Sequence, residues 1–346
     1  MRAVVFVDAG AVRVAEVADP QITEPTDAVV RVTRTAICGS DLHFFHLKAP
    51  VAPGDVMGHE AVGVVEAVGS DVTAVEPGDR VVVSFTIACG SCWFCRRGQT
   101  QLCERSAILG AGTFGGDLPG AQADRVRVPW ADVNLLPVPA DVDDERALFV
   151  GDVLTTAWYA SSVAEARTND VVAVVGAGPV GILCVQALRA RGVEHVIAVD
   201  REPERLALAA GAGATTVDVT ASNPQTAVEE RTDGRGADVV LDAVGHPDAF
   251  DSAMRVVRRG GRVVVVGMYA GETVPLQLGV AWARAIDLRF AGICPVHAWW
   301  AEAMAEVEAG RMDPLPLVTH RLSLEDAPLG YDLFDRREAL KVLLSP

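Results

Sequence analysis

Residues 171–181 read VVAVVGAGPVG, a β-branched run followed at once by glycines spaced as G-x-G-x-x-G. The run predicts a buried strand, and a helix is expected to begin within the glycines. Gly176 permits the tight turn, Gly178 lets the backbone approach a pyrophosphate, and Gly181 lets the helix pack closely on the sheet. Free N–H groups at the helix N-terminus attract phosphate, so this unit predicts a dinucleotide-binding site. Its predicted phosphate-binding residues are Gly176, Gly178, Pro179, Val180 and Gly181.

Asp200 ends the next predicted strand, nineteen residues after Gly181. A carboxylate at this point can accept hydrogen bonds from both ribose hydroxyls of the adenosine and would repel a 2′-phosphate. NAD is therefore favoured over NADP, although Arg201 and Arg205 could partly offset the carboxylate charge. The alternative role of Asp200 is to cap the helix that follows.

Strands and helices alternate outward from this motif. Valine-rich strands separated by helices indicate a parallel sheet with both faces covered, a doubly wound α/β fold of the Rossmann type. Residues 171–188 carry no charge, but the glycines and proline interrupt them, so a membrane helix is not expected. The predicted strands are residues 171–175, 196–199, 216–219, 239–243, 263–266 and 287–292, with helices over 179–191 and 204–210.

A different pattern occupies the chain before residue 151. Short β runs at residues 29–32, 63–68 and 80–84 alternate with glycine- and proline-containing turns, which predicts a mostly antiparallel β domain. An amphipathic helix is expected over residues 299–309. We therefore predict one domain from residues 1–152 and 295–346, and a second from residues 153–294.

The composition sets the class of protein. The chain has 346 residues, 50% of them hydrophobic and 22% charged, which exceeds the usual size of a single core and excludes disorder. Thirty basic and 46 acidic residues give a net charge of −16, which argues against nucleic acid as a partner. The first ten residues, MRAVVFVDAG, hold too short an apolar run for a signal peptide. We expect a cytoplasmic protein.

Four cysteines cluster as Cys89-x2-Cys92-x2-Cys95-x7-Cys103. Four thiolates within fifteen residues can surround one tetrahedral Zn²⁺, and four protein ligands leave no position open for a substrate. We therefore predict a structural zinc that stabilises residues 89–103, here called the zinc lobe. The alternatives are an iron–sulfur cluster, four unrelated buried cysteines, and a nucleic-acid zinc module, which the acidic chain disfavours.

A second candidate metal site involves Cys38, in the stretch CGSDLH at residues 38–43, and His59, which is followed by Glu60. Cys and His are suitable zinc ligands, and a catalytic zinc needs three protein ligands and one open position. Glu60, adjacent to His59, and Asp152, at the predicted domain junction, are the candidates for the remaining ligand.

The order of these motifs resembles the zinc-dependent medium-chain dehydrogenases/reductases over essentially the whole chain. It is most similar to bacterial zinc alcohol dehydrogenases whose third ligand is Asp, and GDVLTT at residues 151–156 resembles their junction motif. The resemblance implies a GroES-like catalytic domain beside the Rossmann domain. It also implies that Cys38, His59 and Asp152 hold a catalytic zinc and that Glu60 is an alternate ligand.

The resemblance further implies the chemistry of an alcohol dehydrogenase. Zinc acts as a Lewis acid on the alcohol oxygen, and hydride passes to the nicotinamide of NAD, giving an aldehyde or ketone. A proton relay would run from the alcohol through Ser40 and the cofactor ribose to His43, while Asp41 orients His59. The alternatives are a surface role for His43, a helix-capping role for Asp41, and a basic partner for Glu60.

The rest of the site is implied by the same resemblance. Thr156, Gly267 and Ile293 would contact the cofactor. Apolar or aromatic alcohols are favoured, although the pocket residues are alternatively core or interface residues, and polyol, sugar or amino-alcohol dehydrogenases of the same family remain open. A zinc- and NAD-binding sensor would need a broken catalytic set. A homotetramer or homodimer is expected from edge pairing of the nucleotide-binding sheets. The predicted pocket residues are Phe85, Trp93, Phe114, Leu118 and Cys294, with Ile293 and Trp300 as further walls.

Overall fold

The structure is a computed structural model that describes residues 1–270 and 273–346. The chain forms two compact units, the first from residues 1–155 and 295–346 and the second from residues 156–294. The first boundary lies three residues after the expected one, and the second lies where it was expected. Among the described helices, none is long and apolar enough to cross a membrane.

A seven-stranded sheet forms the centre of the first unit, and its pairings are antiparallel except for the pair formed by the two C-terminal strands. In spatial order its strands are β16 (His320–Ser323), β17 (Val342–Ser345), β3 (Ala28–Ile37), β4 (Ala61–Val68), β5 (Arg80–Val83) and β9 (Leu135–Pro137), while β8 (Arg125–Val128) pairs with β3. Around it lie β1 (Arg2–Asp8), β2 (Ala11–Glu16), β6 (Thr86–Ile87), β7 (Ala107–Ile108), α1 (Asp41–Phe45), α2 (Ala131–Asn134), α3 (Asp144–Val150), α10 (Val296–Glu308), α11 (Ala327–Asp335), and the 3-10 turns η1 (Cys95–Arg97), η2 (Thr100–Leu102), η3 (Gly112–Gly115), η4 (Leu315–Leu317) and η5 (Leu324–Asp326).

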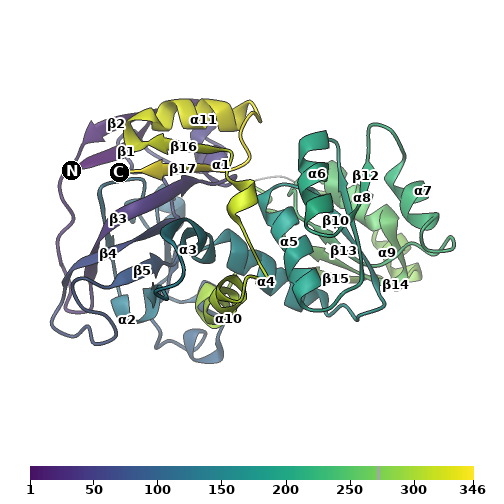
Figure 1. Cartoon of the computed structure of the whole chain (residues 1–346), viewed down its shortest axis with the longest axis horizontal. Helices are drawn as coiled ribbons and strands as arrows, with labels where there is room; N and C mark the ends of the chain where they lie inside the picture. The colour runs from purple at the N-terminus through teal and green to yellow at the C-terminus, as the bar shows by residue number, and fades with distance from the viewer. Residues whose placement is uncertain (271–272) are drawn as a thin grey trace. The chain divides into compact units, whose positions relative to one another are not determined.

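The C-terminal segment returns to the N-terminal strands. Figure 1 shows β16, β17 and α11, in yellow, beside the purple strands β1 to β3, and β17 pairs directly with β3. Buried apolar side chains from both ends of the chain, including Ile37, Tyr331 and Val342, share one hydrophobic core. This return brings residues near position 340 into the interior of the unit that begins at Met1.

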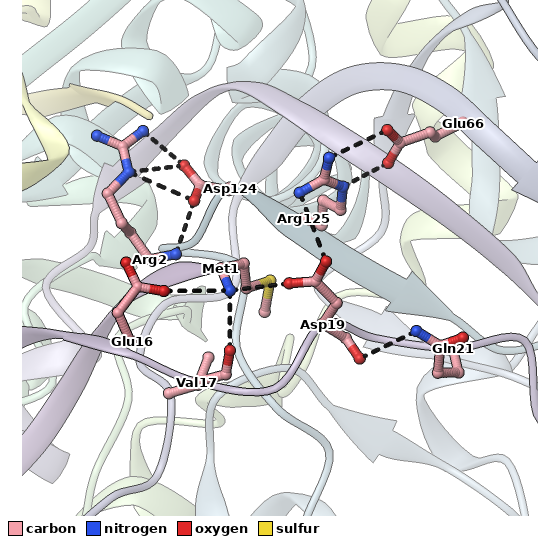
Figure 2. Close-up of polar contacts among 9 residues, drawn as sticks. All are labelled: Met1, Arg2, Glu16, Val17, Asp19, Gln21, Glu66, Asp124 and Arg125. Carbon is pink, nitrogen blue, oxygen red and sulfur yellow. Dashed lines mark hydrogen bonds and ion pairs between the residues drawn. The ribbon is translucent and has the colours of Figure 1, made fainter.

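Ion pairs hold the N-terminal hairpin against the sheet (Figure 2). The amino group of Met1 lies 2.8 Å from an Asp19 carboxylate oxygen. Arg2 pairs with Asp124 at 2.6 Å, just before β8, and Arg125 reaches back to Asp19. Because exposed pairs of this kind contribute only about 0–1 kcal/mol each, they position the hairpin more than they stabilise the fold.

The second unit is a six-stranded parallel sheet, which confirms the predicted doubly wound fold. In spatial order its strands are β12 (Thr215–Asp218), β11 (His195–Asp200), β10 (Val171–Val175), β13 (Ala237–Asp242), β14 (Val257–Val265) and β15 (Asp287–Phe290). After β10 the chain adds β11 and β12 on one side of the sheet, and it then crosses over to add β13 on the other side of β10. Open α/β sheets bind ligands at such a switch point. The helices are α4 (Val153–Ala164), which begins in the first unit, α5 (Pro179–Ala190), α6 (Pro203–Gly211), α7 (Pro224–Glu229), α8 (Pro247–Val256) and α9 (Leu278–Ala283).

Two elements are longer than expected. Helix α10 begins at Val296 instead of residue 299, because Val296 continues the buried stripe formed by Trp300, Ala303 and Met304. Burying a large apolar side chain contributes about 1.5–3 kcal/mol, which favours the additional turn. Strand β14 begins at Val257 instead of residue 263, and a register shift against β13 accommodates its glycines.

Candidate active site

Four side chains of the first unit converge on one point. Cys38 follows β3 and His59 precedes β4, and these strands are neighbours with Thr35 paired to Ala61. Asp152 joins them from the turn between α3 and α4. One ligand atom from each of the four side chains lies within 4.8 Å of all the others. This group, here called the catalytic cluster, consists of Cys38, His59, Glu60 and Asp152.

The donor atoms of the catalytic cluster suit Zn²⁺. His59 Nε2 lies 3.1 Å from Asp152 Oδ2, and Cys38 Sγ lies 3.8 Å from the same oxygen. His59 and Asp152 are both buried. A thiolate, an imidazole nitrogen and a carboxylate oxygen are ordinary zinc ligands, and three of them leave one coordination position open. The residues therefore fit a catalytic zinc.

The Asp41 carboxylate faces the His59 ring. Its Oδ1 lies 3.1 Å from His59 Nδ1, and its Oδ2 accepts a hydrogen bond from the Cys38 backbone N–H at 2.9 Å. Placing the Nδ1 proton toward Asp41 leaves Nε2 free to bind a metal, the arrangement that carboxylates impose on metal-binding histidines.

Protons compete with a metal for the donor atoms of the cluster. Burial lowers the pKa of His59, but Asp41 and Asp152 outweigh it and raise that pKa well above its ordinary value. Burial also raises the pKa of the Cys38 thiol. Metal binding at this cluster must therefore displace protons from both side chains.

Lys341 is a partner of the cluster that sequence reasoning did not identify. Its Nζ donates to both carboxylate oxygens of Glu60 at 2.6 Å, and the two side chains are 1% and 0% exposed. The pair links Lys341, directly before β17, to Glu60, which follows His59. A signal was present in the sequence, because the chain has only two lysines, Lys48 and Lys341, among its 30 basic residues.

The four cysteines of the zinc lobe also meet, with ligand atoms within 4.8 Å of one another. The sulfurs of Cys92 and Cys95 are 3.4 Å apart, and the Cys89 N–H donates to the sulfur of Cys103 at 3.3 Å. Burial raises the pKa of the Cys89 thiol, but hydrogen bonds from Ser91 and Arg105 outweigh it and lower the pKa to about 5. Burial raises the pKa of the Cys95 thiol to about 12, so a metal must displace a proton there. The convergence of four sulfurs fits a closed tetrahedral zinc site.

The glycines of the second unit have the geometry of a phosphate cradle. Gly176 has φ +94°, and Gly178 caps the N-terminus of α5 with open space where a side chain would point. A Cβ at Gly181 would lie 1.9 Å from the Gly176 carbonyl oxygen, so only glycine permits this packing. Pro179 occupies the first turn of α5, where its missing N–H costs no hydrogen bond. The backbone can therefore approach a pyrophosphate closely.

Asp200 ends β11 beside these glycines. Its Oδ2 accepts from the Ala177 N–H at 2.6 Å and its Oδ1 from the Arg201 N–H at 2.7 Å. The Arg201 guanidinium pairs with Glu202 at 3.3 Å. Asp200 Oδ1 also accepts from the N–H of Glu202, the residue at the N-terminus of α6, at 3.0 Å. The carboxylate thus holds both the glycine turn and the backbone that leads into the next helix.

Two family models match the chain: the alcohol dehydrogenase GroES-like domain over residues 24–140 and the zinc-binding dehydrogenase domain over residues 179–309. The solved alcohol dehydrogenase from Thermus sp. ATN1 is 46% identical with a TM-score of 0.95, over 100% of this chain and 99% of its own. The "Probable zinc-binding alcohol dehydrogenase" of Mycobacterium tuberculosis is 39% identical, over 100% of this chain and 89% of its own. The chain belongs to the zinc-binding alcohol dehydrogenases. A Sinorhizobium meliloti structure bound to NADP is 29% identical with a TM-score of 0.86, over 100% of this chain and 99% of its own.

The predicted relay residues of this dehydrogenase lie at and beside the cluster. Ser40 Oγ is 3.3 Å from His59 Nε2. His43 lies half-buried on α1, the short helix that also carries Asp41. The segment after β3 thus supplies the candidate ligand Cys38, the hydroxyl of Ser40 and the carboxylate of Asp41 within six residues.

The predicted pocket residues of the dehydrogenase are dispersed. The Phe85 ring lies 6.1 Å from the His59 ring, edge to face. Trp93 lies half-exposed on the zinc lobe with the Arg97 guanidinium 3.8 Å from its ring centre, and Leu118 belongs to the core of the β unit. Phe114 is half-exposed and packs on Phe44, Trp300 is buried beside His297, and Cys294 is buried in the second unit.

The remaining predicted cofactor residues all lie in the second unit. Thr156 is half-buried on α4, Gly267 lies against the backbone of Gly245 after β14, and Ile293 is partly exposed. A Cβ at Gly267 would lie 2.1 Å from the Gly245 nitrogen, so the loops after β13 and β14 meet without room for a side chain. Arg205 is half-buried on α6.

Proposed function

We propose that this dehydrogenase interconverts an alcohol and an aldehyde or ketone with NAD as hydride carrier and Zn²⁺ held by Cys38, His59 and Asp152. The observation that carries the proposal is the convergence of these three buried donors with Asp41 behind His59. When bound, Zn²⁺ supplies Lewis acidity to the substrate oxygen. Glu60 serves as the alternate ligand.

The chain's own groups then orient the reactants and move a proton. Ser40 Oγ, next to the cluster, accepts the proton that leaves the alcohol oxygen, and His43 passes it to solvent. The Phe85 ring forms an apolar wall beside His59 and favours an apolar or aromatic alcohol.

Replacement of one ligand tests the proposal. We expect His59→Ala to lose turnover with alcohol and NAD⁺ on the order of 10³-fold, because several kcal/mol of charge stabilisation depend on the metal. Metal analysis should give two zincs per chain in the parent protein and one in the variant. His195→Ala, at an exposed position on β11, is the control. Unchanged turnover in His59→Ala, or strong preference for sorbitol or threonine in a substrate panel, would overturn the assignment.

NAD is proposed over NADP. Asp200 places a carboxylate at the end of β11, and the guanidinium of the next residue, Arg201, is paired with Glu202. The NADP-bound relative shows that the phosphorylated cofactor also binds a protein of this family. Comparing kcat/KM for the two cofactors in the parent protein and in Asp200→Asn tests the proposal. We expect NAD to be preferred in the parent protein and less so in the variant, whereas NADP preference in the parent protein would refute it.

We further propose that the dehydrogenase forms a homodimer or homotetramer through the outer strand of its second unit. β15 is an edge strand, and Phe290 on it is 70% exposed. On α9, Leu278 is 70% and Trp282 83% exposed. An uncovered strand edge beside large apolar side chains is an association surface. Light scattering should give a dimer or tetramer for the parent protein and a smaller species for Trp282→Asp; a monomeric parent protein would contradict the proposal.

A cytoplasmic location is proposed from the thiols. None of the seven cysteines, all of them in the described part of the chain, forms a disulfide, and four of them form the zinc lobe, which is the state that a reducing compartment maintains.

A further inference from the structure

A buried amide lies behind the orienting carboxylate of the catalytic cluster. Gln122 is fully buried between Ala121 and Ala123, just before β8. Its Nε2 donates to the Ala36 carbonyl at 2.9 Å and to Asp41 Oδ2 at 3.3 Å. Its Oε1 accepts from the hydroxyl of Tyr331 on α11 at 2.9 Å. These bonds use the amide donors and acceptor in three different directions.

The partners of Gln122 determine which way its amide points. A backbone carbonyl can only accept, so the NH₂ group must face Ala36 and Asp41. The Oε1 atom is then left to Tyr331, whose hydroxyl must donate. Tyr331 is itself held in place, because it is fully buried and its ring stacks on Phe45 at 5.2 Å.

The backbone around Gln122 is tied to the segment that carries His59. The Gln122 N–H donates to the Met57 carbonyl at 2.9 Å, and the Ala121 N–H donates to the Gly58 carbonyl at 2.8 Å. Gly58 leaves room for the amide: a Cβ at Gly58 would lie 2.3 Å from Gln122 Cγ. The residue next to His59 is therefore shaped around this side chain.

The chain of contacts ends at the imidazole. Asp41 Oδ2 accepts from both Gln122 and the Cys38 N–H, which leaves Oδ1 to face His59 Nδ1 at 3.1 Å. Loss of the amide would leave Oδ2 held by the Cys38 N–H and would widen the range of the terminal torsion of the carboxylate. His59 would then lose a fixed partner without losing any ligand atom.

We propose that Gln122, held by Tyr331, is a positioning residue of the catalytic metal centre, acting on His59 through Asp41. The inference rests on the proposed zinc site. It assigns Tyr331, on the C-terminal helix α11, a part in holding the metal ligand His59, which lies 272 residues earlier in the chain.

The test uses the full chain with Co²⁺ in the catalytic cluster and the lobe metal retained. Gln122→Met keeps the side-chain length and removes the amide, and Tyr331→Phe keeps the stacked ring and removes the hydroxyl. The measurements are the rate of Co²⁺ transfer to a chelator, the visible absorption of bound Co²⁺ and the melting temperature. Asp27→Asn is the control, because Asp27 is a fully buried side chain of the same unit whose contacts go to Thr23, Glu24 and Arg127.

We expect about tenfold weaker Co²⁺ retention and an altered absorption band in Gln122→Met, since partners behind metal ligands typically change affinity by 10- to 100-fold. Tyr331→Phe should show a smaller change, about fivefold, for one lost hydrogen bond. Asp27→Asn should lower the melting temperature and leave the Co²⁺ spectrum unchanged.

Parental retention and spectrum in a folded Gln122→Met would overturn the inference. Should Gln122→Met not fold, Tyr331→Phe decides alone, and an unchanged spectrum and transfer rate in it count against the inference. A parent protein that takes up metal only at the zinc lobe would instead refute the proposed function.

Discussion

The zinc lobe and the catalytic cluster are two metal sites in the same unit, and they are built differently. The lobe takes its four ligands from residues 89–103, and its hydrogen bonds come from neighbours such as Ser91 and Arg105. The cluster takes ligands from residues 38–152, and buried side chains from distant segments stand behind them. The lobe has the form of a site where a metal would organise a loop, whereas the cluster is a preformed interior that would position a metal for chemistry.

Removal of a lobe ligand should have the largest effect and should leave the cluster intact. We expect Cys95→Ser to release the lobe zinc, whose binding free energy is on the order of 10 kcal/mol, and to make residues 89–103 sensitive to protease. Metal content and limited proteolysis measure this outcome. Cys184→Ala, in the apolar interior of α5, should retain both metals. Loss of both metals from Cys95→Ser would show that the two sites are coupled.

The ion pair behind the cluster should matter for folding. Lys341→Met leaves the Glu60 carboxylate buried and unpaired, which we expect to cost about 3–5 kcal/mol in the free energy of unfolding. The double variant Glu60→Gln with Lys341→Met should recover much of that loss. Lys48→Met, at the exposed second lysine, is the matched control in urea unfolding. A single variant as stable as the control would mean that the pair is dispensable.

His297 on α10, which lies behind the segment leading into the lobe, makes the free energy of unfolding depend on pH. Asn134 Oδ1 accepts from the Ala88 N–H, next to Cys89, so His297 Nε2 must donate to it at 2.7 Å. His297 Nδ1 is buried without a hydrogen-bond partner among the described residues. Burial lowers the pKa of His297 to about 4.

The native state therefore holds His297 neutral, while the unfolded chain takes up a proton below pH about 6.5. The stabilisation is complete above that pH and is lost as the pH falls toward 4, by about 3 kcal/mol in total. Unfolding measured at several pH values should show this slope in the parent protein and a flatter one in His297→Gln. Equal slopes would refute the assignment.

The two sites should also differ in how acid releases their metals. The raised pKa values of His59 and Cys38 mean that protons compete with the metal at the cluster near neutral pH. In the lobe the four thiols are divided. Burial raises the pKa of Cys95 to about 12 and also raises that of Cys103. Hydrogen bonds outweigh burial at Cys89 and lower its pKa to about 5, and they also lower the pKa of Cys92. Lowering the pH from 8 to 6 should weaken metal binding at the cluster about tenfold per unit for each proton displaced. A chelator should therefore remove the cluster metal first. Release of the lobe metal first would reverse the comparison.

The fold was largely predictable, because its signals are local. The valine run at 171–175 and the glycines after it predicted the strand–turn–helix that the structure contains, and the alternation that follows predicted the parallel sheet. The errors fell at element ends, where tertiary burial of Val296 extended a helix and a register shift lengthened β14.

The catalytic cluster was predictable only in part. Cys38 and His59 were inferred from residue type, and Glu60 and Asp152 were candidates from their positions, whereas their separate roles were implied only by the family resemblance. Gln122 and Tyr331 were not identified, because a buried glutamine or tyrosine has no spacing pattern that marks it. Lys341 was marked only by the rarity of lysine in this chain, which does not say where the side chain lies.

Sequence alone determined the zinc lobe, whose ligands lie within fifteen residues, and the nucleotide-binding turn, where glycine is required by local backbone geometry. Only the tertiary structure placed Asp41 with Gln122, 81 residues apart, Gln122 with Tyr331, 209 apart, and Glu60 with Lys341, 281 apart. The physical reason is that polar groups become selective partners once the sheet and the returning C-terminal strand remove water from them. A charge or an amide in that interior must find a partner wherever along the chain it lies.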